Sequence, residues 1–404
     1  KMTAFTAILD ATFTDAEGRL KLNRQLATAC SQEGACDAAG ERMLFAQASA
    51  QAESMPDGVF RSRGGAHGRP LEVSYVDEGG IDQGGLYRDF LDACSTELMS
   101  GSLPLLMPTP NNRSNSGESR ESWTLAPVAT TKAVKRMLRF LGRLMGICVR
   151  RGDVLPLALS RSTWRLLVGD EPTIEDLAAA DVATAECVRQ LSDVEALGVT
   201  ASDFEDCFGE LNFVYHNSSG EQVPLLEGGA DMRVTFENAK RFAKLIEHMR
   251  AHEAAEHVGC LRAGMATVVP IGCFALWTWR DLEARVCGNP QINLELLRKK
   301  AYYEGVSETA QHVQFMWQVL EAMDDEDRQH FLRFCWGRSR LPPEGSPLWG
   351  NGFKVAEASD IPEGGLPRAH TCFFQIDLPR YASKQQAEDR ILFAIRNCVS
   401  VSNA

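Results

Sequence analysis

Apolar side chains recur at a helical period along much of this chain. The strongest repeat places apolar residues three or four positions apart, at Val134, Leu138, Leu141, Met145 and Cys148. Such spacing puts side chains on one face of an α-helix. Additional apolar residues widen that face, which predicts a helix buried on most sides. Weaker repeats predict further helices in residues 1–60, 86–99, 178–197 and 236–252.

Strict alternation of apolar and polar residues is rare and predicts only short strands. Residues 71–76 alternate in this way, and residues 352–357 and 371–377 are further candidates. Polar capping residues predict helices that begin at Ser307, at Asp324 or Asp325, and at Ser383. The last of these helices would turn four apolar side chains inward: Ala387, Ile391, Ala394 and Ile395.

A change of pattern near residues 299–307 divides the chain. Gly305 separates two segments with apolar repeats, and we place a domain boundary between residues 302 and 303. The sequence therefore predicts an α+β protein in two parts. Residues 1–302 form a larger, mainly helical domain with small sheets, and residues 303–404 form a small α/β domain.

Composition and charge narrow the possible functions. The chain is 44% hydrophobic and 24% charged, as expected for globular protein rather than disordered chain. Its net charge of −12 argues against a broad surface that binds nucleic-acid phosphates. The apolar run over residues 268–277 is too short to span a bilayer, and no signal peptide pattern is present at the N-terminal end.

Twelve cysteines occur without a single C-x-x-C pair, so the common structural zinc patterns are missing and we expect no metal. Several cysteines, such as Cys148 and Cys273, lie inside apolar stretches. Buried free thiols in a reducing compartment explain them, which favours the cytosol or nucleus.

Cys372 stands out by its position. It lies between a loop rich in proline and glycine and an alternating strand, where functional residues are common. The positive charges of Arg368 and His370 would favour its thiolate form. The local pattern alone leaves open that Cys372 is one more core thiol, because free cysteines are often buried and inert.

Five stretches, in the same order, resemble the HECT family of ubiquitin ligases. They are the strand and glycine-rich bend of residues 71–90, R-F-L-G-R-L-M-G-I-C at 139–148, the run ending in V-C-G at 282–288, F-C-W-G-R-S-R-L-P at 334–342, and L-P-R-A-H-T-C-F at 366–373. The last one matches the family's acceptor loop, L-P-x-x-x-T-C-F. The resemblance covers about residues 40–404, and F-F-Q after the cysteine and L-P-R-Y at 378–381 are most similar to the large HERC-type ligases.

The resemblance implies a bilobal fold and an E3 ubiquitin ligase activity. Cys372 would accept ubiquitin from an E2 enzyme as a thioester and pass it to a lysine of a protein substrate, without a cofactor. His370 and Thr371 would shape the loop, and His370 either aids proton transfer or is structural. Arg368 either orients the acyl carbonyl or is a solvated loop charge, and Asp377 either positions the incoming lysine or is a strand-end charge.

The resemblance also implies a site for the E2 enzyme and a hinge. It places E2 binding in a subdomain over about residues 205–280, with Met265, Val269 and Phe274 as candidate contacts. Each of the three is equally well explained as a core residue. The hinge between the lobes would lie at Tyr303, Glu304 and Gly305, and replacing Gly305 by proline would slow transfer.

Two other classes of function are weighed against the ligase. A papain-like cysteine hydrolase needs a histidine after its cysteine, but all eight histidines precede Cys372. A scaffold that binds E2 or ubiquitin without catalysis stays open, because the tail has Val401 where the family often has an aromatic residue. The repeats that HERC-type ligases carry upstream are absent here, so we expect a piece of a longer protein.

Overall fold

The computed structural model describes residues 2–63, 69–78, 85–288, 292–336, 340–341, 344 and 349–397. Within these ranges the side chains of residues 2–6, 326 and 372 are not described. The glycine-rich bend at residues 79–84 and the tail position of Val401 therefore lie outside the described residues, as does the side chain of Cys372.

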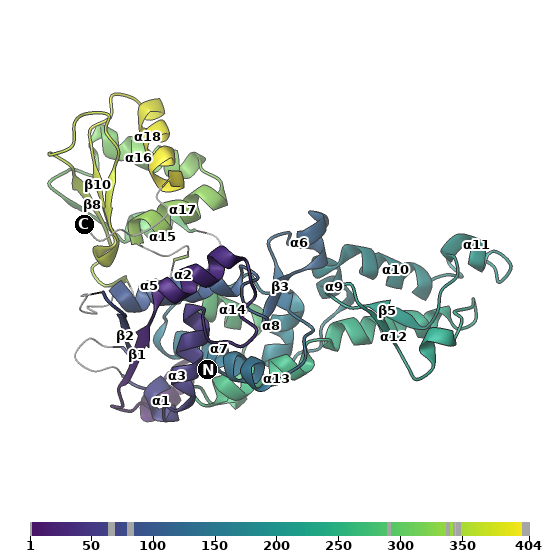
Figure 1. Cartoon of the computed structure of the whole chain (residues 1–404). Coiled ribbons are helices and arrows are strands. Elements are labelled where there is room, and N and C mark those ends of the chain that lie inside the picture. Colours follow the sequence, from purple (N-terminus) through teal and green to yellow (C-terminus); the bar gives the residue numbers. More distant parts are fainter. Residues whose placement is uncertain are drawn as a thin grey trace.

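The buried apolar side chains form three cores, one for each part of the molecule. Figure 1 shows these parts as a large lobe, a long arm that projects to one side, and a small lobe. The large-lobe core runs from Leu9 to Cys287 but leaves out the arm, whose own core runs from Val188 to Ile246. The small-lobe core begins at Ile292. The predicted α+β, bilobal class is confirmed.

The large lobe is mainly helical. Its elements are α1 (Met2–Ala11), β1 (Gly18–Leu22), α2 (Arg24–Glu33), α3 (Leu44–Glu53), α4 (Asp57–Phe60), β2 (Leu71–Tyr75), α5 (Gly85–Leu98), β3 (Leu106–Pro108), α6 (Pro110–Ser114), β4 (Trp123–Leu125), α7 (Lys132–Arg151), α8 (Arg161–Val168), α13 (Ala255–Ala266), η2 (Ile271–Leu276) and α14 (Trp279–Cys287). β1 pairs in parallel with β2, and β3 pairs antiparallel with β4.

Helix α7 forms the centre of the large lobe, as its apolar repeat predicted. It begins after Thr131, whose side chain accepts a hydrogen bond from the Val134 amide, and it ends at Gly152 in a left-handed cap. It packs very closely on α13. A Cβ atom added to Gly142 would lie 2.1 Å from the Leu261 carbonyl oxygen, and one added to Gly264 would lie 2.0 Å from that of Arg139. Only glycine permits this approach.

The arm is inserted between α8 and α13. It contains α9 (Ile174–Ala180), α10 (Val182–Ser192), α11 (Phe204–Phe208), β5 (Val214–His216), β6 (Gln222–Pro224), η1 (Gly229–Asp231) and α12 (Ala239–His252). β5 and β6 form an antiparallel hairpin around Asn217, whose side chain accepts hydrogen bonds from the amides of Ser219 and Glu221. The arm therefore starts about thirty residues earlier than the subdomain predicted at residues 205–280, and ends near residue 252.

The small lobe is a four-stranded sheet with helices on one side (Figure 1). Its elements are α15 (Leu294–Lys299), β7 (Ala301–Glu304), α16 (Gln311–Ala322), α17 (Asp325–Trp336), β8 (Phe353–Glu357), β9 (Arg368–His370), η4 (Thr371–Phe373), β10 (Gln375–Leu378) and α18 (Lys384–Asn397). The strand order is β7-β8-β10-β9, with β9 antiparallel to β10 and the other neighbours parallel. The inward residues predicted for the last helix are buried.

The predicted hinge at Tyr303, Glu304 and Gly305 is wrong. Tyr303 and Glu304 lie in β7, and Tyr303 pairs with Val355 of the neighbouring strand β8. A strand that is hydrogen-bonded into the small-lobe sheet moves with that lobe. The peptide after it, at Gly305, therefore cannot separate the two lobes.

The boundary predicted between residues 302 and 303 shifts for the same reason. The chain leaves the large-lobe core after Cys287 and joins the small-lobe core at Ile292. Local caps also differ from prediction. The helix expected from Ser307 begins at Gln311 instead. In α14, Thr278 and Asp281 form a capping box.

Candidate active site and docking arm

Cys372 lies in a tight turn between two paired strands of the small lobe. β9 and β10 run antiparallel, with His370 opposite Gln375 and Arg368 opposite Asp377. The turn η4 joins the two strands and carries Cys372 at its middle. Residues that face each other across an antiparallel pair project from the same side of the sheet. The register therefore gathers four polar side chains next to the turn.

Asp377 is the centre of this polar group. Its side chain accepts a hydrogen bond from Gln375 Nε2 at 2.6 Å, and from Arg368 through Nε at 3.3 Å and Nη2 at 3.1 Å. His370 Nε2 lies 3.0 Å from Asp377 Oδ2. Arg368 also pairs with Asp360 at 2.9 Å. Sequence reasoning missed Gln375 and Asp360, because only the strand register and the preceding loop bring them to this group.

The surroundings of Asp377 keep it ionised. Its side chain is only 9% exposed, and burial by itself would raise the pKa of this carboxyl. Hydrogen bonds from Gln375, His370 and Arg368 outweigh burial, so the pKa of Asp377 is lowered below its ordinary value. The carboxylate is therefore a fixed negative charge that orients the imidazole of His370.

The three predicted supporting residues come together here. His370 contacts Asp377 through Nε2, so the other ring nitrogen, Nδ1, takes no part in that contact. Arg368 is bound between two carboxylates, which raises the pKa of its guanidinium. The Thr371 carbonyl oxygen lies 3.5 Å from the Phe374 amide and closes the turn. Chemically, this is a carboxylate-oriented imidazole beside a nucleophile turn.

Two phenylalanines after Cys372 point in opposite directions. Phe373 is 71% exposed, whereas Phe374 is buried at 3% exposure. Leu366, which begins the L-P-R-A-H-T-C-F stretch, is also exposed. The turn thus presents an apolar side chain to solvent next to the nucleophile and anchors the following one in the core.

The three residues predicted to contact an E2 enzyme do not lie on a surface. Met265, Val269 and Phe274 are at most 1% exposed and belong to the large-lobe core. They follow the arm in sequence: Met265 lies in α13, Phe274 lies in η2, and Val269 lies between these two helices. Direct contact with a partner is therefore corrected to a structural role for all three.

The arm differs from the rest of the molecule in charge. Residues 170–253 contain eighteen Asp and Glu against six Lys and Arg, a net charge of −12 that equals the net charge of the whole chain. The remaining residues are therefore neutral in sum. An acidic surface of this kind attracts basic partner surfaces and accelerates their association.

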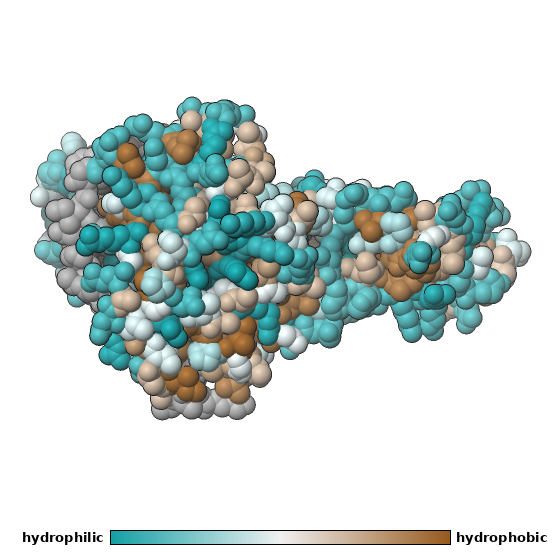
Figure 2. Space-filling view, turned by 60° about the horizontal axis from the view of Figure 1, so that its bottom comes forward, coloured by the Kyte–Doolittle hydropathy of each residue, from teal (hydrophilic) through white to brown (hydrophobic). Residues whose placement is uncertain are grey.

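Apolar side chains are also exposed on the arm. Leu197 is 56% exposed and Met232 is 40% exposed. In the space-filling view, the arm carries a cluster of hydrophobic surface surrounded by hydrophilic residues (Figure 2). Hydrophobic surface with a polar rim is typical of protein-binding sites.

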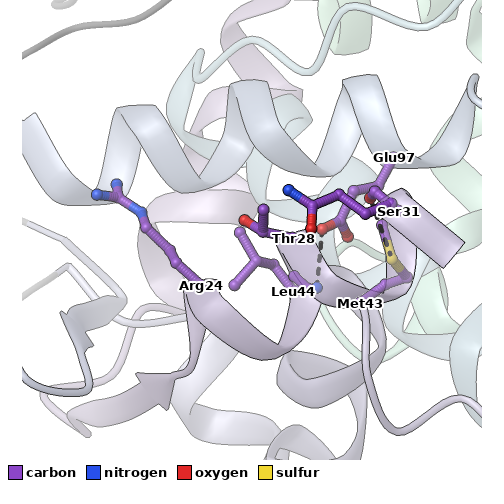
Figure 3. Close-up of a pocket in the computed structure, with 8 residues that line it drawn as sticks. Arg24, Thr28, Ser31, Met43, Leu44 and Glu97 are labelled. Atoms are coloured by element: carbon purple, nitrogen blue, oxygen red, sulfur yellow. Dashed lines mark hydrogen bonds between the residues drawn. The ribbon is translucent and has the colours of Figure 1, made fainter.

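A groove in the large lobe contains a buried carboxylate (Figure 3). Glu97 of α5 accepts hydrogen bonds from the Leu44 and Phe45 amides at 2.8 and 2.7 Å and so caps the start of α3. Burial raises the pKa of Glu97 to about 7, although these two hydrogen bonds act in the opposite direction. Arg24 and Thr28 of α2 line the same groove.

Among the residues that the structure describes, no group of three or more His, Cys, Asp or Glu side chains is placed to hold a metal ion. None of the helices described there is both long and apolar enough to cross a bilayer.

The fold and the site define a bilobal α+β protein with a cysteine-bearing turn on its small lobe and an acidic arm on its large lobe. The family described as HECT-domain (ubiquitin-transferase) matches residues 93–403, and the chain belongs to this family.

Relatives extend the match to almost the whole chain. The chain is 35% identical over 99% of its length to the human "E3 ubiquitin-protein ligase HERC2" and 30% identical over 88% to the human "Probable E3 ubiquitin-protein ligase HECTD4". It is 28% identical over 80% to "E3 ubiquitin-protein ligase UPL2" of Arabidopsis thaliana. It spans only 8%, 10% and 9% of the lengths of these three relatives.

Proposed function

We propose that this chain accepts ubiquitin on Cys372 from an E2 enzyme and transfers it to a lysine of a protein substrate. The observation that carries the proposal is the position of Cys372 in a turn beside an imidazole oriented by a buried carboxylate, within a chain of the HECT family. The names of the relatives support an E3 ligase activity. A reducing compartment, the cytosol or nucleus, would keep the thiol free.

The reaction has two acyl transfers. In the first, the Cys372 thiolate attacks the carbonyl carbon of the thioester between ubiquitin and the E2 cysteine, and the E2 thiolate leaves. In the second, the lysine amine attacks the new thioester, a C–N bond forms, the C–S bond breaks and the amine loses a proton. Sulfur suits both steps because a thiolate is a good nucleophile and a good leaving group.

His370 and Asp377 assist these steps. With Nε2 bound to Asp377, the Nδ1 atom of His370 accepts a proton from the thiol or from the attacking amine. Asp377 fixes the ring orientation and stabilises the imidazolium that forms. Arg368 is held by two carboxylates and positions Asp377 rather than the acyl group.

The arm binds the E2 enzyme in this proposal. Its net charge of −12 favours a basic partner, and Leu197 and Met232 provide exposed apolar contacts. The small lobe then moves relative to the large lobe, so that Cys372 faces first the E2 enzyme and later the substrate.

A single-turnover assay tests the acceptor residue. The chain is mixed with labelled ubiquitin already loaded on each of a panel of E2 enzymes, and products are separated without reducing agent. We expect an adduct that reducing agent removes, absent from Cys372→Ala, and a reductant-resistant oxygen ester on Cys372→Ser. A wild-type chain that forms no adduct with any E2 enzyme would favour a binding scaffold without catalysis.

A second assay tests the arm. Leu197→Ser combined with Met232→Ser should weaken E2 binding by about tenfold, since two exposed apolar contacts are lost. The matched control replaces Leu26 and Val128, which are exposed on the large lobe, by serine. Equal binding by the two double variants would place the E2 site elsewhere than on the arm.

A further inference from the structure

One aromatic residue beside Cys372 has a backbone conformation that is unusual for its type. Phe374 follows η4 directly and has φ 48° and ψ 58°, in the left-handed region. Bulky L residues avoid this region because Cβ crowds the neighbouring carbonyl. The other described non-glycine residues with positive φ are small and polar: Asp77, Asn115 and Ser119. A phenylalanine persists there only where the surrounding packing holds it.

The ring of Phe374 provides that packing. It stacks on Trp336 with ring centroids 4.1 Å apart and an angle of 7° between the planes. Phe353 lies 4.9 Å from it and Trp349 lies 6.3 Å from it, so aromatic rings surround the side chain on several sides. Stacked rings at these distances add to the stabilisation that burial alone provides.

The backbone of Phe374 is held as well. Its carbonyl oxygen accepts a hydrogen bond from the Lys354 amide at 2.9 Å, which is the first bond between β10 and β8. The turn therefore has a fixed end at Phe374. On the other side of Cys372, Thr371 and His370 are partly exposed, and Phe373 projects into solvent.

A contact with the end of the large lobe follows the aromatic group along the chain. Trp336 is the last residue of α17, and Arg340, four residues later, donates a hydrogen bond from Nη1 to the Gly288 carbonyl oxygen at 3.4 Å. A Cβ atom added to Gly288 would lie only 3.0 Å from the Leu341 carbonyl oxygen. The aromatic group thus supports the turn of Cys372, and Arg340 contacts Gly288, the residue that follows the end of the large-lobe core.

We infer that Phe374 is a positioning residue: its stack on Trp336 fixes the direction in which the turn presents Cys372 to the thioester of the E2 enzyme. The stack sets the orientation of the turn, and transfer between two thiols requires such an orientation. The effect of Phe374 on the rate of ubiquitin transfer rests on the proposed function. Its effect on the orientation of the turn does not.

A matched pair of substitutions separates the ring from the backbone strain. Asparagine and histidine both adopt positive φ more readily than other residues, but only histidine keeps a flat ring that can stack on Trp336. We expect Phe374→Asn to load ubiquitin at least about tenfold more slowly than wild type and Phe374→His to stay within about threefold of it. Rates are taken in single turnover at saturating loaded E2 enzyme.

A stability control accompanies the pair. Phe331→Leu alters the same small-lobe core through a residue whose ring pairs with that of Phe353; among the described residues, no ring pair joins Phe331 to Phe374. Its thermal midpoint should fall at least as far as that of Phe374→Asn, while its loading rate per folded molecule stays at the wild-type value. A general loss of small-lobe stability would instead slow both variants alike.

Hydrogen exchange gives a readout that needs no ubiquitin. Amides in the 366–378 peptide should exchange faster in Phe374→Asn than in wild type and Phe374→His. The inference is overturned if the asparagine and histidine variants load at the same rate, or if exchange in this peptide is equal in all three proteins. If the wild type forms no adduct, the proposed function fails and the exchange result alone decides the inference.

Discussion

The arm and the small lobe are both attached to the large lobe, but their charged side chains are arranged differently. The arm holds the whole net charge of the chain, and several of its acidic side chains, such as Glu195 and Asp206, are exposed. In the small lobe, the charges near Cys372 are bound to one another around Asp377. An open charge attracts a partner from a distance, whereas a closed network fixes the geometry of a reaction.

This difference fits the two tasks of the proposed ligase. Docking benefits from long-range attraction and from apolar contacts such as Leu197, and it tolerates a surface that is wet and mobile. Acyl transfer needs a nucleophile whose neighbours are already in place, as His370 is by its contact with Asp377.

The base of the arm contains an exception, a closed network around Arg250. Its side chain is 3% exposed and donates to Asp181 at 2.9 Å, to Ser218 Oγ at 2.7 Å and to Glu253. Arg250→Ala leaves two buried carboxylates without a cationic partner, so we expect a loss of about 3 kcal/mol in the free energy of unfolding of the arm. This loss is measured by unfolding the protein in denaturant and monitoring hydrogen exchange of the amides in residues 174–252.

The control for Arg250 lies on the same arm. Arg233 pairs with Glu205 and Glu210 at 3.0 Å, but its side chain is 52% exposed. Arg233→Ala should lower the free energy of unfolding of the arm far less than Arg250→Ala does, because exposed ion pairs contribute little. Similar losses in the two variants would mean that burial does not distinguish the base of the arm from its surface.

The stability that Glu97, the carboxylate in the large-lobe groove, contributes should depend on pH. Its pKa of about 7 in the folded protein is above the ordinary value, so the stability it contributes is present at low pH and is lost as pH rises through about 7. The change is on the order of 2–3 kcal/mol between pH 4.5 and 8. Glu97→Gln should flatten this part of the stability curve, as measured by urea unfolding at each pH.

Asp377 should show the opposite sign. Its pKa in the folded protein is lowered, so its contribution to stability is present above the ordinary carboxyl pKa of about 4 and is lost as pH falls below that value. A wild-type curve that falls between pH 5 and 8 and again below pH 4 would show both groups. A curve flat from pH 5 to 8 in wild type would contradict the account of Glu97.

Asp377→Asn tests the closed network directly. Asparagine keeps the shape but removes the charge that orients His370, and we expect ubiquitin loading to slow about thirtyfold, equivalent to about 2 kcal/mol in the activation free energy. Single-turnover loading measures it. Asp360→Asn is the matched control, because Asp360 binds the same Arg368 from a position that is 62% exposed. Its loading rate should change by less than about twofold.

Local signals in the sequence were sufficient for the central helix and for the start of the last one. The apolar repeat of α7 and the cap at Ser383 depend only on neighbouring residues, and both are found in the structure. The network around Asp377 could not be predicted from the sequence. It depends on the register of β9 against β10 and on the loop that brings Asp360 to Arg368. Sequence distance also misled: Met265 is close to the arm along the chain but lies in the large-lobe core.

The hinge illustrates a second limit of the sequence. Gly305 looks like a break between two patterned segments, and its φ of 70° does mark a turn. Whether a turn separates two lobes depends on which sheet the preceding strand joins, and β7 joins β8 some fifty residues later in the chain. Strands that pair from such distant positions in the sequence leave no signal in a short stretch of residues around Gly305.

The smallest expected effect concerns the open charge at the end of the arm. Glu195→Gln combined with Asp206→Asn removes two exposed negative charges and leaves the arm folded. We expect E2 binding to weaken by about three- to tenfold, through a slower association rate, with a shallower dependence on salt. Stopped-flow association at several ionic strengths measures both quantities.

The control keeps the total charge of the variant and changes only its location. Glu17→Gln combined with Glu53→Gln removes two exposed charges from the large lobe, which is close to neutral outside the arm. Because a surface field decays within roughly 8 Å at physiological ionic strength, this variant should associate at the wild-type rate. If both variants slow association equally, net charge rather than the placement of charge on the arm governs docking, and the contrast between an open arm and a closed small lobe loses its functional meaning.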